Sequence, residues 1–94
     1  MPISLTPRER SRLKARAHGL EPVVRVGQPG LSDRLVAEVE RALAAHALVK
    51  IRLDESDRDR REELGEALSA RTDAAIVQRV GKVLVLWRPR PDDD

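Results

Sequence analysis

The spacing of apolar residues divides the chain into seven short elements separated by brief polar connections. Apolar residues three and four positions apart predict helices at about 7–18, from 33 to near 46, and from the end of the acidic stretch 54–59 to about 71. Alternating or continuous apolar runs predict strands at 23–26, 48–53, 75–80 and 83–88. Gly81 and Lys82 then form a two-residue turn between the last two strands, of the type that places glycine first.

The resulting order, α-β-α-β-α-β-β, predicts a single compact α/β (α+β) domain over residues 1–89. Strands separated by helices need crossover connections and therefore pair partly in parallel, whereas the final hairpin is antiparallel. We expect a small mixed four-stranded sheet packed by helices, followed by an acidic disordered tail at 90–94. The expected core residues are Leu5, Leu13, Val24, Val26, Leu35, Val39, Leu43, Val49, Ile51, Leu64, Leu68, Val77 and several of Val83–Leu86.

The first predicted helix has clear signals at both ends. Thr6 and Glu9 fit a capping box, and Pro7 occupies the first helical position, where its missing amide is tolerated. Gly19 is expected to end the helix, and Leu20 to continue its buried side.

The charged residues on the exposed side of this helix are almost all cations. The net charge of +2 is unevenly distributed, with +4 over residues 1–30, −3 over 31–74, +4 over 75–91 and −3 over the last three residues. Two stripes face away from the core, one of Arg8, Arg12 and Arg16 and one of Lys14 and His18. Glu9 is the only acid on the helix. A solvated face normally mixes both signs, so this face favours contact with phosphate.

The loop between the first strand and the second helix is the second candidate site. It consists of Gly27, Gln28, Pro29 and Gly30. A loop with glycine at both ends lets a nucleic-acid backbone approach closely, and the helix start behind it directs amides toward phosphate. KH modules clamp RNA backbone with such a GxxG loop. Arg25, two residues upstream, adds a cation, whereas the loop centre is uncharged.

Composition excludes many classes of active site. The chain has 94 residues, no cysteine and one aromatic residue, Trp87, so cysteine-based catalysis, disulfides and cysteine-held metals are excluded. His18 and His46 lie near predicted helix ends, where a cation complements the dipole. No catalytic constellation can be assembled, and we expect no enzyme activity, cofactor, metal or small-molecule substrate. The longest apolar run, Val83–Trp87, is too short for a membrane span, which indicates a cytoplasmic protein.

Four sequence blocks, in this order, resemble the CRM domain and specifically the small stand-alone bacterial YhbY-like proteins. The blocks are 17–24 (AHGLEPVV), 26–31 (VGQPGL), 42–51 (ALAAHALVKI) and 80–88 (VGKVLVLWR). The similarity covers about Leu5 to Pro89. Two positions depart from the family pattern: Trp87 stands where tyrosine is more common, and Asp73 where glycine is usual.

The resemblance implies an RNA-binding domain of the same element order, related in fold to the C-terminal domain of bacterial translation initiation factor 3. Stand-alone members are associated with precursors of the large ribosomal subunit, and plant organellar relatives with group II intron splicing. By position, Gly27 and Gly30 match the loop glycines of the family, and Lys14 and His18 match its first helix.

Our hypothesis from the sequence is a monomeric RNA-binding protein that acts on structured ribosomal RNA during large-subunit assembly. The expected contact residues are Arg8, Arg12, Lys14, Arg16, His18, Arg25, Gly27, Gln28, Pro29, Gly30, Lys82 and Arg88. The lone aromatic residue argues against an RRM-type stacking platform. The alternative is a protein-interaction module on the ribosome or an RNA-processing complex, which would use the acidic third helix without contacting RNA.

Overall fold

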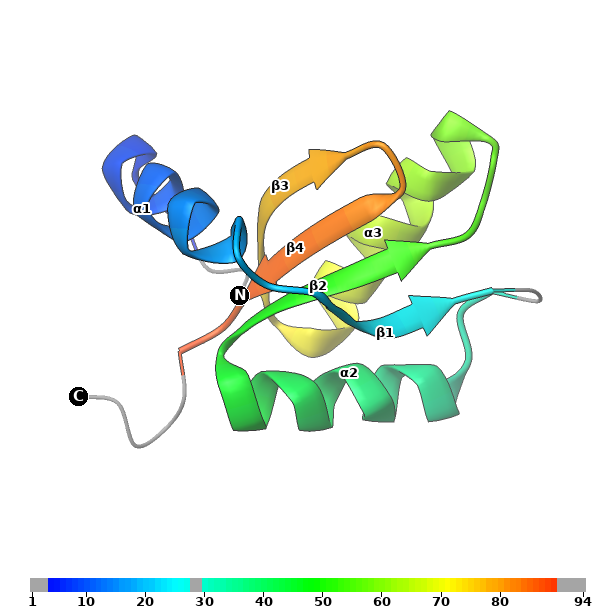
Figure 1. The fold of residues 1–94 in the computed structure, drawn as a ribbon. Helices are drawn as coiled ribbons and strands as arrows, with labels where there is room; N and C mark the ends of the chain where they lie inside the picture. The colour runs from blue at the N-terminus through cyan, green and yellow to red at the C-terminus, as the bar shows by residue number, and fades with distance from the viewer. Residues whose placement is uncertain (1–3, 28–29, 90–94) are drawn as a thin grey trace.

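The predicted order of elements is confirmed in the computed structural model, which describes residues 4–27 and 30–89 (Figure 1). The elements are α1 (Pro7–Ala17), β1 (Pro22–Val26), α2 (Asp33–His46), β2 (Leu48–Leu53), α3 (Arg58–Thr72), β3 (Ala75–Val80) and β4 (Val83–Trp87). Their ends differ from the predicted ones by at most a residue or two. The predicted tail at 90–94 lies outside the described residues.

The four strands form one mixed sheet in the order β1-β2-β4-β3. β1 runs parallel to β2, and α2 supplies the crossover between them, whereas the β2–β4 and β3–β4 pairs are antiparallel. α2 and α3 pack on one face of the sheet and α1 packs on the other (Figure 1). β4 therefore lies in the middle of the sheet, buried on both sides.

The two sheet faces have separate hydrophobic cores. The larger core joins α2 and α3 to alternate strand residues, including Val24, Val49, Ile51, Leu84 and Leu86. The smaller core places Leu13 and Ala17 of α1 against Leu48, Val77 and Val85, with Leu5, Val83 and Trp87 at its margin. α1 is short and covers only part of its face, so the rest of that sheet face stays open.

The start of α1 is held by the predicted local signal, whereas its end is capped by His18 and not by Gly19. The Thr6 hydroxyl accepts a hydrogen bond from the Glu9 amide, and the Thr6 amide donates one to Glu9 Oε1 at 2.9 Å. Together the two bonds complete the capping box. The hydrogen bond from the Thr6 backbone also lowers the pKa of Glu9 below its ordinary value. At the end of α3, Asp73 takes the left-handed conformation with φ +57°, which glycine adopts most readily and which aspartate tolerates.

A second expectation at the end of α1 is wrong. Leu20 does not continue the buried side of the helix, and 39% of it is exposed. The helix ends at Ala17, and a hydrogen bond from the Leu20 amide to the Ala17 carbonyl turns the chain toward β1. This turn carries Leu20 off the helical path and away from Leu13.

Candidate nucleic-acid interface

The outer side of α1 carries four exposed cations, Arg8, Arg12, Lys14 and Arg16, which we call the basic face. Leu13 and Ala17 anchor the opposite side of the helix in the core, which fixes the direction in which these cations point. None of the four has a carboxylate oxygen within 4.0 Å in the part of the chain that the structure describes. Glu9 is the only acid on α1, so the basic face keeps a net positive charge even though Arg12 also acts on Glu9 and helps to lower its pKa.

The fifth cation of α1 has a structural role. Arg10 is partly buried, and its Nη1 donates to the carbonyls of Ile76 and Val77, the latter at 3.1 Å. A register shift between Ile76 and Gln78 interrupts the β3–β4 ladder at this point. Arg10 therefore ties α1 to the edge strand, and it is not part of the basic face.

The sheet face on which α1 packs is left uncovered beside the helix, and we call this uncovered part the open sheet face. It presents three further cations, Arg25, Lys50 and Arg52. They alternate along β1 and β2 with buried residues of the larger core, so they point to the side on which α1 lies. Asp54 pairs with both arginines, with carboxylate oxygens 3.1 Å from Arg25 Nε and 2.8 Å from Arg52 Nε. Arg25 was predicted as a contact residue, whereas Lys50 and Arg52 were not, although the alternation of residues 48–53 already pointed them away from the core.

The two glycines of the loop differ in what they require. Gly30 has φ +104°, a conformation that L side chains rarely adopt, so the backbone needs glycine there. Gly27 has an ordinary backbone conformation, and a Cβ added to it would meet no heavy atom within 4 Å. Nothing in the described chain fills the space beside Gly27, so a ligand backbone could approach it. Gln28 and Pro29 lie outside the described residues.

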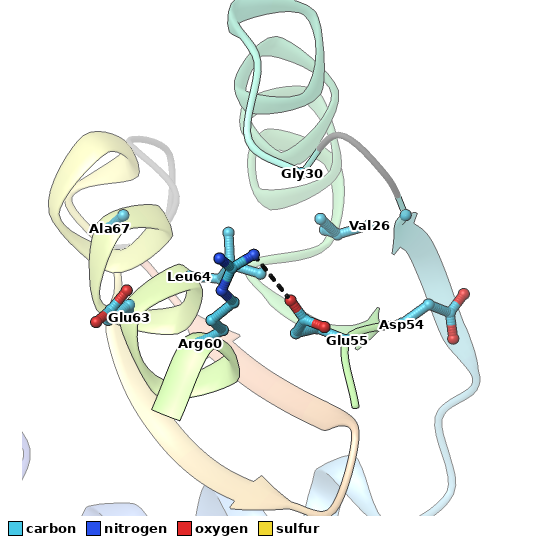
Figure 2. A pocket seen from close by; sticks show the side chains of 9 residues that line it. Val26, Gly30, Asp54, Glu55, Arg60, Glu63, Leu64 and Ala67 are labelled. Carbon is cyan, nitrogen blue, oxygen red and sulfur yellow. Dashed lines mark ion pairs between the residues drawn. The ribbon is translucent and has the colours of Figure 1, made fainter. Parts of the chain in front are cut away.

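A hollow of about 380 Å³ lies beside this loop on the α3 side, and we call it the acidic hollow. Its lining residues are Val26, Gly27, Gly30, Asp54, Glu55, Arg60, Glu63, Leu64 and Ala67. In Figure 2, Arg60 and Glu55 point toward one another, and they pair at 3.7 Å. With three carboxylates and one cation that is already paired, the hollow repels phosphate. A phosphate is therefore disfavoured on the α3 side of Gly27.

The remaining predicted contact residues fall in three different places. Lys82 lies exposed at the tip of the β3–β4 hairpin, where its carbonyl accepts the Leu53 amide, at the same end of the sheet as the GxxG loop (Figure 1). His18 is exposed just after α1. Arg88 lies apart from the basic face, because its Nη1 donates to Glu40 and to the Thr72 carbonyl, both at 2.8 Å, and so links α2 to the end of α3.

Trp87 lies beside the basic face. It lines a hollow of about 140 Å³ together with Glu9, Arg12, Arg16 and apolar residues of the smaller core. Within residues 4–27 and 30–89, no three His, Cys, Asp or Glu side chains gather as metal ligands, and no helix is long and apolar enough to cross a membrane.

Comparison with known proteins decides the family. Residues 5–88, almost the whole chain, match the model of the CRS1 / YhbY (CRM) domain. The chain belongs to the CRM domain family. Its blocks 17–24, 26–31, 42–51 and 80–88, and the helices and strands that carry them, are therefore those of a CRM domain.

Three relatives support this membership. An RNA-binding protein of Haemophilus influenzae is 40% identical over 86 residues, which cover 92% of this chain and 87% of that protein. A "probable RNA-binding protein" of Pseudomonas aeruginosa is 36% identical over 89 residues, 95% of this chain and 86% of that protein. The solution structure of a hypothetical Staphylococcus aureus protein, put forward as RNA-binding, superposes with a TM-score of 0.85 at 25% identity and covers 97% of this CRM chain and 95% of its own. None of these three is named as an enzyme.

Proposed function

We propose that this CRM protein binds structured ribosomal RNA during assembly of the large ribosomal subunit, without catalysing a reaction. The observation that carries the proposal is the basic face of α1, four exposed cations with no carboxylate within 4.0 Å in the described chain. Such a face attracts a polyanion over a distance and pairs with phosphates at contact. The RNA-binding names of the relatives agree with this chemistry.

In this proposal the phosphate backbone and the shape of the RNA are recognised more than the sequence of its bases. Arg8, Arg12 and Arg16 hold phosphates on α1, and Arg25 extends the contact across the open sheet face toward Gly27. Paired RNA is recognised mainly through its shape, its phosphates and its 2′-hydroxyls, and this needs no row of aromatic residues. The ribosomal target rests on the resemblance to stand-alone YhbY-like proteins.

A salt titration with fragments of large-subunit ribosomal RNA tests the RNA-binding part. The logarithm of the affinity should fall linearly with the logarithm of salt, by about 0.7–0.9 for each phosphate contacted, which gives a slope of about −3 to −4 for the four cations of α1. Anisotropy of labelled RNA measures the affinity. The emission of Trp87, the only aromatic residue of the chain, gives a second signal from beside Arg12 and Arg16. An RNA affinity that does not change with salt concentration would contradict the proposal.

Crosslinking in cells tests the ribosomal part and the protein-interaction alternative together. Crosslinked nucleotides should map to immature large-subunit RNA, and co-purifying proteins should be lost after nuclease treatment because RNA bridges them. Direct protein partners that survive nuclease, with no crosslinked nucleotide, would favour the alternative. On α3 itself, Glu62 and Glu66 already pair with Arg58 and Arg79, so part of the acidic charge that the alternative would use is neutralised.

A further inference from the structure

A second hollow, of about 350 Å³, lies where the chain passes from α1 into β1, and we call it the apolar hollow. Its lining residues are Arg16, Leu20, Glu21, Val23, His46, Leu48, Val49 and Lys50. Leu48 and Val49 are almost fully buried and supply its floor, whereas Leu20 and Val23 are 39% and 53% exposed at its mouth. These are two of the three large apolar residues that the described chain exposes.

Leu20 is held at the mouth by both of its backbone groups. Its amide donates to the Ala17 carbonyl at 3.0 Å, and its carbonyl accepts Lys50 Nζ at 3.0 Å. The second bond reaches across the sheet to β2 and braces the connection between α1 and β1. The backbone that carries this exposed apolar side chain is therefore held in place before any ligand arrives, which lowers the entropy lost on binding.

Val23 is positioned by an irregularity in the strand. Pro22 pairs with Lys50 and Val24 pairs with Ile51, so Val23 is an extra residue on β1 with no partner residue of its own on β2. Such bulges re-aim a side chain and recur beside functional sites. Here the bulge leaves Val23 about half exposed while Val24, the next residue, is buried in the larger core.

The rim of the apolar hollow is cationic. Arg16 and Lys50 line it together with His46, and Glu21 is the one acid among the lining residues. Arg16 also belongs to the basic face, so the hollow continues directly from the proposed phosphate contacts. An apolar floor and mouth with cations at the rim matches a nucleotide, which has a flat apolar base next to an anionic phosphate.

We propose that the apolar hollow receives one unstacked nucleobase of the RNA whose phosphates lie on α1. The base packs against Leu20 and Val23, and its flanking phosphates lie between Arg16 and Lys50. This inference rests on the proposed function and deepens it, because it selects RNA with an unpaired nucleotide over uninterrupted duplex. Apolar contact takes the place of the aromatic stacking that the composition rules out as a general mode.

Two RNA hairpins with the same stem test the proposal. One carries a single unpaired adenosine in the stem, and the other carries an abasic residue at the same position. The wild-type protein should bind the first about tenfold more tightly, the order expected from burying several tens of Å² of apolar surface. The double variant Leu20→Gln, Val23→Thr should lose this ratio, yet bind the abasic hairpin as wild type does and with the same salt slope.

Val80→Thr is the matched control, since Val80 is 56% exposed on β3 and does not line the apolar hollow. It should leave the ratio unchanged. When 2-aminopurine replaces the unpaired adenosine, its fluorescence emission should change when the hairpin binds the wild type or Val80→Thr. It should not change when the hairpin binds the double variant. A wild-type ratio near one, or a ratio that the double variant keeps, overturns the base site while leaving RNA binding intact. Absence of salt-dependent binding to both hairpins would instead remove the proposed function. A side chain from a protein partner would then be the occupant to consider.

Discussion

α1 and α3 lie on opposite faces of the sheet and are both rich in arginine, yet their cations are in different states. On α3, Arg58 pairs with Glu62, Arg60 with Glu55 and Arg71 with Asp33, while Arg61 donates to the Glu55 and Ser56 carbonyls. On α1, Arg10 alone has such a partner, and the four cations of the basic face have none in the described chain.

This difference shows why a count of charges does not locate an interface. Exposed ion pairs such as Arg58 with Glu62 contribute little to stability, about 0–1 kcal/mol each. They do cancel the local field, however, and a phosphate would have to displace the carboxylate before it could use the cation. A cation without a carboxylate beside it can meet a phosphate without that competition. A polyanion therefore gains more on the basic face than on α3.

The largest expected effect comes from removing three charges of the basic face. The triple variant Arg8→Gln, Arg12→Gln, Arg16→Gln should weaken RNA binding about a hundredfold near 0.1 M salt, because each lost phosphate contact contributes about 0.7–0.9 to the salt slope. The slope should flatten by about 2–3. Glutamine keeps the helix propensity, so the folded fraction measured by circular dichroism should not change.

The matched control removes the same charge from the opposite side of the molecule. Arg58→Gln, Arg60→Gln, Arg71→Gln takes three exposed cations from α3, each of which pairs with a carboxylate. It should lower affinity only a few-fold, through the reduced overall charge, and leave the salt slope near that of wild type. An equal loss in both triple variants would show that binding follows net charge and that the contrast between α1 and α3 is irrelevant to RNA.

Much of the fold could be predicted because its signals are local. The capping box of Thr6 and Glu9 and the glycine turn at Gly81 depend on residues a few positions apart. The strand order depends on tertiary packing. The unbroken apolar run Val83–Trp87 is typical of a strand buried on both faces, and β4 does lie in the middle of the sheet, but no strand order was predicted from it.

The candidate site could be predicted only in part. The helical period placed Arg8 and Arg12 on the exposed side of α1, and the strand period pointed Lys50 and Arg52 away from the larger core. What the sequence could not provide is the partner of each cation. Arg88 donates a hydrogen bond to Glu40, 48 positions away in the chain, and therefore lies apart from the basic face. This contact exists only in the folded chain.

The next prediction separates the structural cation of α1 from the basic face. Arg10→Met keeps an unbranched side chain like the aliphatic part of arginine but removes the donors to Ile76 and Val77, and it should lower the free energy of unfolding by about 1–2 kcal/mol. Urea unfolding measures this loss. Arg12→Met should show the reverse pattern, with unchanged stability and weaker RNA binding. Equal stability of the two variants would contradict the assignment of Arg10.

The loop glycines allow a finer test of where RNA approaches. Gly27→Ala should leave stability unchanged, because the added Cβ meets open space, and should weaken RNA binding about three- to tenfold by holding the backbone away. Gly30→Ala should instead lower stability by about 1–2 kcal/mol, owing to its φ of +104°. Thermal unfolding and RNA anisotropy are measured on both. If Gly27→Ala binds RNA as wild type does, the loop lies outside the interface.

The smallest effect is expected for Asp54→Asn, which tests whether the interface extends from α1 over the open sheet face. Asp54 engages Arg25 and Arg52, so Asp54→Asn should free both and raise RNA affinity about two- to threefold at low salt, where such charge effects are screened least. Glu62→Gln, on α3, makes the same change in net charge at a distance from this face and is the control. If both variants raise affinity equally, only overall charge has changed. A gain confined to Asp54→Asn would instead place Arg25 and Arg52 in contact with RNA and extend the unpaired surface of α1 onto the sheet.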